Sequence, residues 1–271
     1  MLSGTIGKLR AEVKAPLQYF FPIGDQELAL RGDGEQRLRL TTQGQIRCQA
    51  CQRLTRKSYN QGYCYPCFTR LAACDMCILK PELCHHAAGS CREPAWGEAH
   101  CMVPHIVYLA NSSGLKVGIT RATQVPTRWI DQGASAALPL FRVGSRYHSG
   151  LIEVALARHV ADKTQWQALL RGDPAELDLV AEAERLLALC AQELAEIEQR
   201  FPRDRQRLLP EVHRFQYPVL RYPDKIKALT LAPDQAIEGC LLGIKGQYLI
   251  LEEGVLNVRK HTSYVVTLEQ L

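Results

Sequence analysis

Two pairs of cysteines at a short, repeated spacing constrain this chain more than any other feature. Cys48 and Cys51 form one C-x-x-C pair, Cys64 and Cys67 form another, and twelve residues separate the pairs. Each pair fits a tight turn that points two thiolates at one ion, and two such turns complete the tetrahedron that structural zinc prefers. We therefore expect these four residues to bind one structural zinc ion.

Further cysteines follow at once and predict a second ion. Eleven cysteines occur in 271 residues, and nine of them lie between positions 48 and 101. The N-terminus has no apolar segment before a small-residue cleavage site, so we expect a cytoplasmic protein whose cysteines bind metal instead of forming disulfides. The expected ligands of a second zinc are Cys74, Cys77, Cys84 and Cys91, with Cys101, His85 or His100 as substitutes for one of them. An iron–sulfur cluster at this second site is the alternative, because sets of four thiolates hold both.

The pattern of the chain predicts an α+β fold in four segments. Polar and apolar residues alternate over residues 36–41, as in a half-buried strand, and apolar runs with glycine turns return near the C-terminus. The expected segments are an N-terminal antiparallel β segment (1–47), a cysteine-rich module of zinc-ribbon type (48–103), an α/β core with a long C-terminal helix (104–201) and a small C-terminal β domain (208–271).

Within the third segment, strands and helices follow in a regular order. Residues 105–110 and 115–119 read as a hairpin around a tight turn, and residues 126–132 as a short helix with Gly133 just past its end. A strand over 140–143 and a helix over 150–170 come next. Asp173 and Pro174 then predict the start of the long helix, which ends before Pro202.

This order resembles the core of the GIY-YIG nucleases. The residues that carry the likeness are Val107-Tyr108, Lys116-Val117-Gly118-Ile119-Thr120, Thr127-Arg128-Trp129 and Glu153. The resemblance implies that Tyr108 and Arg128 position water and stabilise the attacked phosphate, and that Glu153 holds one Mg²⁺ or Mn²⁺ ion. Lys116 occupies the position of the second family tyrosine, where it would serve as a phosphate clamp. Gln132 stands where the family often has a histidine.

The whole chain also resembles one uncharacterised family of domain-of-unknown-function proteins, in which a cysteine module precedes a diverged core of this kind. Residues 61–67, 91–97, 116–121 and 126–133 carry that likeness. It names no substrate. Residues 127–133 hint at a phosphate site at the start of a helix, or at simple packing with Trp129 buried.

Charge and composition favour a nucleic-acid partner. The net charge is +5, and cations alternate with aromatic residues between positions 53 and 70, as suits contacts with phosphates and bases; the same aromatics would also serve to pack the zinc turns. No apolar run reaches the length of about eighteen residues that a membrane helix needs, so no membrane partner is expected.

Three functions remain open from the sequence. The first is a zinc-containing protein that binds RNA or DNA and cleaves it as a metal-dependent phosphodiesterase. The second is an inactive scaffold that binds RNA or a protein partner. The third is an iron–sulfur protein that modifies nucleic acid.

Overall fold

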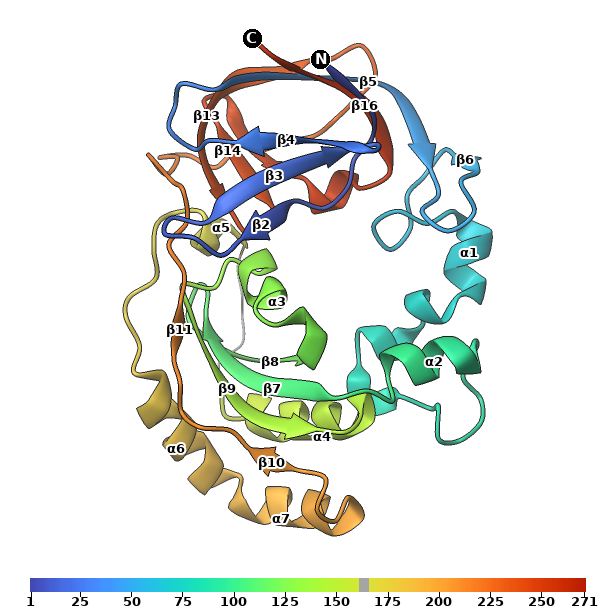
Figure 1. Ribbon diagram of the computed structural model, residues 1–271, viewed down its shortest axis with the longest axis vertical. Helices are drawn as coiled ribbons and strands as arrows, with labels where there is room; N and C mark the ends of the chain where they lie inside the picture. The colour runs from blue at the N-terminus through green and yellow to red at the C-terminus, as the bar shows by residue number, and fades with distance from the viewer. Residues whose placement is uncertain (161–165) are drawn as a thin grey trace.

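The computed structural model describes residues 1–160 and 166–271, and these form a mixed α+β fold with three sheets. Figure 1 shows the N- and C-terminal β segments together at one end, the segment around β7 and β9 at the other, and the cysteine module along one side between them. None of the described helices is both long enough and apolar enough to span a membrane.

The two terminal segments share one antiparallel sheet, apart from one parallel pair at its edge. Its order is β1-β16-β5-β13-β14-β15-β12, with β6 beside β5. The strands are β1 (Leu2–Thr5), β5 (Arg37–Arg47), β6 (Leu54–Thr55), β12 (Ala228–Leu229), β13 (Ile237–Lys245), β14 (Tyr248–Leu251), β15 (Gly254–Asn257) and β16 (Tyr264–Gln270). A second sheet of β2 (Arg10–Glu12), β3 (Gln18–Ile23) and β4 (Gln26–Leu30) packs into the same core. The alternation predicted for β5 is confirmed, with Leu38 and Leu40 fully buried.

The third sheet carries the predicted hairpin. Its order is β10-β9-β7-β8, with β11 beside β9, and its strands are β7 (His105–Asn111), β8 (Leu115–Arg121), β9 (Ala136–Val143), β10 (Gln206–Arg207) and β11 (His213–Arg214). The short helix α3 (Thr127–Asp131) lies on one face. Helix α4 (Arg146–Ala157) lies on the other face with α6 (Leu179–Leu189) and α7 (Ala191–Arg200). The predicted order of strand, strand, helix, strand and helix is therefore confirmed.

The single helix predicted over residues 150–170 is wrong in both its bounds. Helix α4 already begins at Arg146, because the Ser145 hydroxyl accepts a hydrogen bond from the His148 N–H and caps it. It ends at Ala157, where the N–H groups of His159 and Val160 turn back to carbonyls three residues earlier. Residues 161–165 lie outside the described part, and α5 (Trp166–Leu169) follows.

The long helix predicted from Asp173 is divided into α6 (Leu179–Leu189) and α7 (Ala191–Arg200). Asp178, and not Asp173, caps α6 by accepting hydrogen bonds from Val180 and Ala181. The Asp173 carboxylate instead accepts from the fully buried Lys245 ammonium at 3.0 Å and from the Tyr222 hydroxyl at 2.7 Å. The chain bends at Cys190, whose backbone leaves the helical region.

Short helices build the cysteine module. They are α1 (Tyr65–Arg70), α2 (Pro94–His100) and the 3-10 turns η1 (Ala72–Cys74), η2 (Met76–Ile78) and η3 (Pro81–Leu83). The module docks on the third sheet through η3, which lies against α4 at Gly150. A Cβ atom at Gly150 would come within 2.6 Å of Pro81 and Glu82, so only glycine permits this approach.

Candidate functional site

The four cysteines of the two C-x-x-C pairs lie around one point. Their sulfur atoms are all within 4.8 Å of one another, and Cys51 Sγ is 3.7 Å from Cys64 Sγ. A zinc ion with Zn–S bonds of about 2.3 Å places tetrahedral sulfurs about 3.8 Å apart, so the thiols fit this ion. Cys48, Cys64 and Cys67 are buried and Cys51 is exposed. The structure thus forms a four-cysteine site suited to zinc.

Local structure explains why these thiols converge. Cys48 follows the end of β5, and its carbonyl accepts from the Gln52 N–H at 2.9 Å, closing the first turn. Cys64 precedes α1, and Cys67 lies one turn into that helix. Each C-x-x-C pair therefore sits on its own tight turn, as the spacing predicted.

The electrostatics of the cluster also favour a cation. Burial raises the pKa of Cys48, but hydrogen bonds from the N–H groups of Cys64, Cys51 and Ala50 outweigh burial and lower it to about 6. Burial and the neighbouring thiols raise the pKa of Cys67 to about 12. Four thiols this close ionise together only with a positive charge between them.

The cysteines proposed for a second ion are less closely grouped. The other candidate cluster in the described residues consists of Asp75, Cys77 and His85. The Asp75 carboxylate is also engaged by Arg92 Nε at 2.7 Å. His100 stacks on Trp96, so it lies outside this cluster.

Most of the remaining cysteines lie near Cys77. Besides burial, the charges of Cys84 and Cys91 raise the pKa of Cys77, and the charge of Cys77 contributes to the raised pKa of Cys101. Cys84 and Cys101 share a thiol hydrogen bond, which is the main reason why the pKa of Cys84 falls to about 6. Cys91 packs against Gly97 in α2. Burial raises the pKa of Cys74, the nearby Asn60 side chain opposes that rise, and the charge of Cys48 from the four-cysteine site adds to it. A second ion on Cys74, Cys77, Cys84 and Cys91 stays a prediction, and so does its iron–sulfur alternative.

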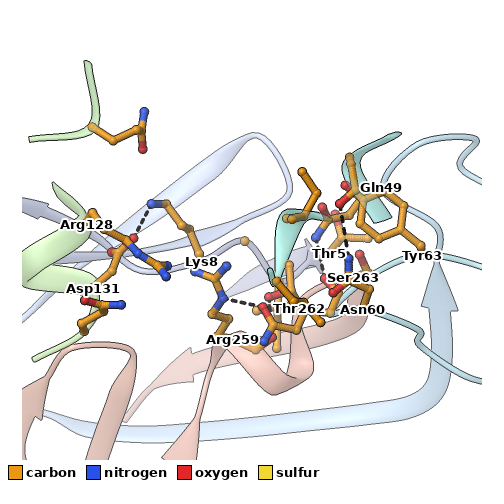
Figure 2. A pocket seen from close by; sticks show the side chains of 18 of the residues that line it. Thr5, Lys8, Gln49, Asn60, Tyr63, Arg128, Asp131, Arg259, Thr262 and Ser263 are labelled. Atoms are coloured by element: carbon orange, nitrogen blue, oxygen red, sulfur yellow. Dashed lines mark hydrogen bonds and ion pairs between the residues drawn. The ribbon is translucent and has the colours of Figure 1, made fainter. Parts of the chain in front are cut away.

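A cavity of about 910 Å³ opens between the terminal sheet, the cysteine module and α3. This volume lies at the upper end of the range typical of ligand sites. Six cationic side chains line it: Lys8, Arg47, Arg121, Arg128, Arg146 and Arg259. Asp131 is the one carboxylate among the described residues that line it, and it pairs with Lys8 at 2.7 Å (Figure 2).

The arginines of this cavity are held in place without carboxylate partners. Within the described part of the chain, none of the five forms an ion pair. Arg146 donates to the carbonyls of Cys77 and Ile78, and Arg259 donates to the Gln61 side chain. Burial and the charge of Arg128 lower the pKa of Arg259. The cavity therefore has unbalanced positive charge and suits an anionic ligand.

The end of the cavity next to the cysteine module has a different character. Amide side chains and one aromatic ring line it, namely Gln49, Gln52, Asn60, Gln61 and Tyr63. Sequence reasoning noted Tyr63 but missed the amides and most of the cationic residues. The cations lie between positions 8 and 259 without any shared spacing, so no local signal could have found them.

Tyr108 and Arg128, two of the four residues assigned by the nuclease resemblance, are joined through the side chain of Gln132. Gln132, with its amide nitrogen toward Tyr108, donates to the Tyr108 hydroxyl at 2.8 Å and accepts from Arg128 Nε at 3.3 Å and Nη2 at 3.1 Å. Gly118 leaves room for the Tyr108 ring, because a Cβ atom there would lie 2.7 Å from the hydroxyl. Arg128 and Gln132 line the cavity, whereas Tyr108 is fully buried behind them.

Glu153 and Lys116 stand beside this group. Lys116 is paired with Ala110 across the hairpin, which places it on the same face of the sheet as Tyr108. Burial raises the pKa of Glu153 to about 7, while the charges of Arg146, Lys116 and Arg128 oppose that rise. All three cations are therefore within electrostatic reach of Glu153.

Comparison with known proteins gives a family without a described activity. A family model described as a protein of unknown function, DUF2797, matches residues 35–266. No curated protein and no solved structure matches the chain.

Proposed function

We propose that this chain, which belongs to the DUF2797 family, binds nucleic acid in its central cavity, with a zinc-bound cysteine module forming one wall. The observation that supports the proposal is the set of six cations around one cavity, where the described lining residues include a single carboxylate. Phosphate groups are the anions that such a set of guanidinium groups binds best, through paired hydrogen bonds.

Zinc would act structurally in this proposal. Cys48, Cys51, Cys64 and Cys67 would supply all four ligands, so no position remains for water or substrate. The ion would hold the turns that carry Gln49, which lines the cavity. A second ion on Cys74, Cys77, Cys84 and Cys91 would stiffen the wall between these turns and α4.

Replacing Arg128 by glutamine tests the binding mode. We expect about 10- to 100-fold weaker binding of single-stranded RNA or DNA, because a charge-assisted hydrogen bond to phosphate is lost. The slope of log affinity against log salt should also fall by about one. Fluorescence anisotropy with labelled oligonucleotides at several salt concentrations measures both.

Arg185→Gln provides the matched control for charge. Arg185 lies on the exposed side of α6 and pairs with Glu182, away from the cavity. This variant should bind as the wild type does. Equal losses in both variants, or no binding by the wild-type protein, would contradict the proposed site.

The group around Tyr108 favours a second function, metal-dependent cleavage of the bound phosphodiester. Arg128 and Lys116 would bind the phosphate, and the Gln132 amide would hold Tyr108 in position. Glu153 would hold a Mg²⁺ or Mn²⁺ ion; burial is the main cause of its raised pKa, with a smaller contribution from the charge of Glu82, and a bound cation would favour the ionised form. Such an ion would stabilise negative charge on the phosphate. The alternative is an inactive scaffold, which the burial of Tyr108 favours.

Incubation of the protein with Mg²⁺ or Mn²⁺ and end-labelled RNA and DNA distinguishes a nuclease from an inactive scaffold. If the protein cleaves, we expect Glu153→Gln to abolish product. The rate should decrease about tenfold per pH unit below about pH 7, because only the ionised Glu153 binds the metal and its pKa is about 7. Binding without cleavage would identify the scaffold, and cleavage that survives Glu153→Gln would exclude the assigned site.

A further inference from the structure

Two chemically different ends divide the central cavity. Figure 2 shows Lys8, Arg128 and Asp131 on one side, with Arg259 between them and a second group formed by Gln49, Asn60, Tyr63, Thr262 and Ser263. Charged groups dominate the first side. Neutral amides, hydroxyls and an aromatic ring dominate the second, where Arg47 adds one cation next to the Gln52 carbonyl. Such a division matches a ligand that is charged at one end and neutral, flat and polar at the other.

From this division we infer that the amide end is a base-binding pocket for single-stranded nucleic acid. One nucleobase would stack on Tyr63 and bond to the amides, while its flanking phosphates lie on Arg259 and Arg128. This inference rests on the proposed nucleic-acid binding and specifies its ligand.

In each of three amide side chains, one polar atom is hydrogen-bonded within the protein and the other is available to a ligand. Gln49 Nε2 donates to the Gln61 carbonyl at 3.0 Å, and Asn60 Nδ2 donates to the Ala73 carbonyl at 3.4 Å. Gln61 uses its side-chain oxygen to accept from Arg259. Among the described residues, the other amide atom of each has no hydrogen-bond partner. The pocket therefore offers acceptors on Gln49 and Asn60 and a donor on Gln61, a mixed set that suits a base edge better than a phosphate.

Backbone strain is concentrated at this end of the cavity. Six non-glycine residues in the described chain have a left-handed φ, and four of them line the cavity: Gln52 (58°), Asn60 (42°), Gln61 (61°) and Ser263 (77°). Each costs conformational energy, and such residues persist where the surrounding contacts hold them, most often at binding sites. The strain turns Asn60 and Gln61 so that both reach one pocket.

Close packing holds the strained residues in place. The Gly62 carbonyl accepts from the Gln49 N–H at 2.8 Å and from the Ser263 hydroxyl at 3.3 Å. Gly62 has a φ of 133°, which residues with side chains rarely adopt, and a Cβ atom there would crowd Gln49 and Ser263, so glycine favours this packing. The pocket is thus formed before a ligand arrives, which lowers the entropic cost of binding.

Tyr63 supplies the stacking surface. Its ring is partly buried against the buried thiols of the four-cysteine site and also lines the cavity, so its orientation depends on that site. Stacking on a fixed aromatic ring is available to an unpaired base, whereas a duplex hides its base edges in pairs. The pocket should therefore discriminate single strands from duplexes.

Fluorescence anisotropy tests the inference. The probes are fluorescein-labelled homopolymers of ten nucleotides, one for each base, as RNA and as DNA. A hairpin duplex and free nucleoside triphosphates serve as competitors. We expect one base to bind more tightly than the others, and the duplex to compete poorly. Tyr63→Leu should weaken binding of the preferred homopolymer about 5- to 100-fold. It should also reduce the preference, with an unchanged salt slope.

Asn60→Gly and Gln61→Gly remove the amides at positions where glycine adopts the left-handed backbone without strain. Both should keep the wild-type zinc content and salt slope but lose base preference. Arg128→Gln should have the opposite effect: it should lower the salt slope and keep the base preference.

The outcomes separate this inference from the proposed function. If all homopolymers bind equally, or if both glycine variants keep the wild-type preference, the base pocket is wrong and nucleic-acid binding stands. Equal competition by one nucleoside triphosphate would overturn the polymeric ligand. Absence of binding by the wild-type protein would overturn both proposals.

Discussion

Cys64→Ser is expected to remove one zinc ion per chain and to unfold the cysteine module. Cys64 is 3% exposed and joins the first turn to α1, so its loss leaves three ligands and a gap in a small core. Structural zinc contributes on the order of 10 kcal/mol to the folding of such modules. We expect faster proteolysis within residues 48–103 and weaker ligand binding in the cavity.

Metal analysis of the purified protein and limited proteolysis measure these effects. Cys240→Ser is the matched control, because Cys240 lies in β13 and outside both candidate metal clusters. An unchanged zinc content in Cys64→Ser would contradict the four-cysteine site. The same analysis tests the second site: iron with a brown colour would identify a cluster, and two zinc ions per chain would identify a second zinc.

Trp129→Ala is expected to lower the free energy of unfolding by about 3–5 kcal/mol, the usual cost of deleting a large buried aromatic side chain. Trp129 has no exposed surface and packs in edge contact with Tyr108, at 5.6 Å between ring centroids. It anchors α3, the helix that presents Arg128 and Asp131 to the cavity. Weaker oligonucleotide binding should accompany the loss of stability, because both side chains lose their support.

Trp129→Phe separates packing from the indole nitrogen. Trp129 Nε1 is buried without a hydrogen-bond partner in the described residues, so its removal should cost little. We expect Trp129→Phe to unfold within a few degrees of the wild type and Trp129→Ala about 10 °C lower, as measured by circular dichroism. Equal unfolding temperatures for the alanine variant and the wild type would show that α3 is held by other contacts.

Local features could be predicted because they depend on neighbouring residues. The C-x-x-C spacing specifies two turns whatever the rest of the chain does, and the four-cysteine cluster has the predicted members. The glycine after Lys245 predicted the turn between β13 and β14, and Gly246 has the left-handed φ of 59° that such a turn requires. Hairpins and alternating strands were predicted for the same reason.

Features that depend on distant partners were misjudged. Asp173, which is followed by proline, was predicted to cap a helix. Its carboxylate instead accepts a hydrogen bond from the buried ammonium of Lys245, 72 positions later. A buried charge needs a partner more than a helix end needs a cap, because an unpaired charge in the interior costs more free energy. The link from Tyr108 through Gln132 to Arg128 also depends on how α3 packs.

By itself, the sequence determined the four-cysteine site and the hairpin of the third sheet, because each rests on short-range geometry. Only the tertiary structure decided that the N- and C-terminal segments share one sheet and that cations from positions 8 to 259 surround one cavity. The physical reason is that charge at a site is a sum over side chains that folding brings together. The sequence positions of these side chains do not indicate that they share one site.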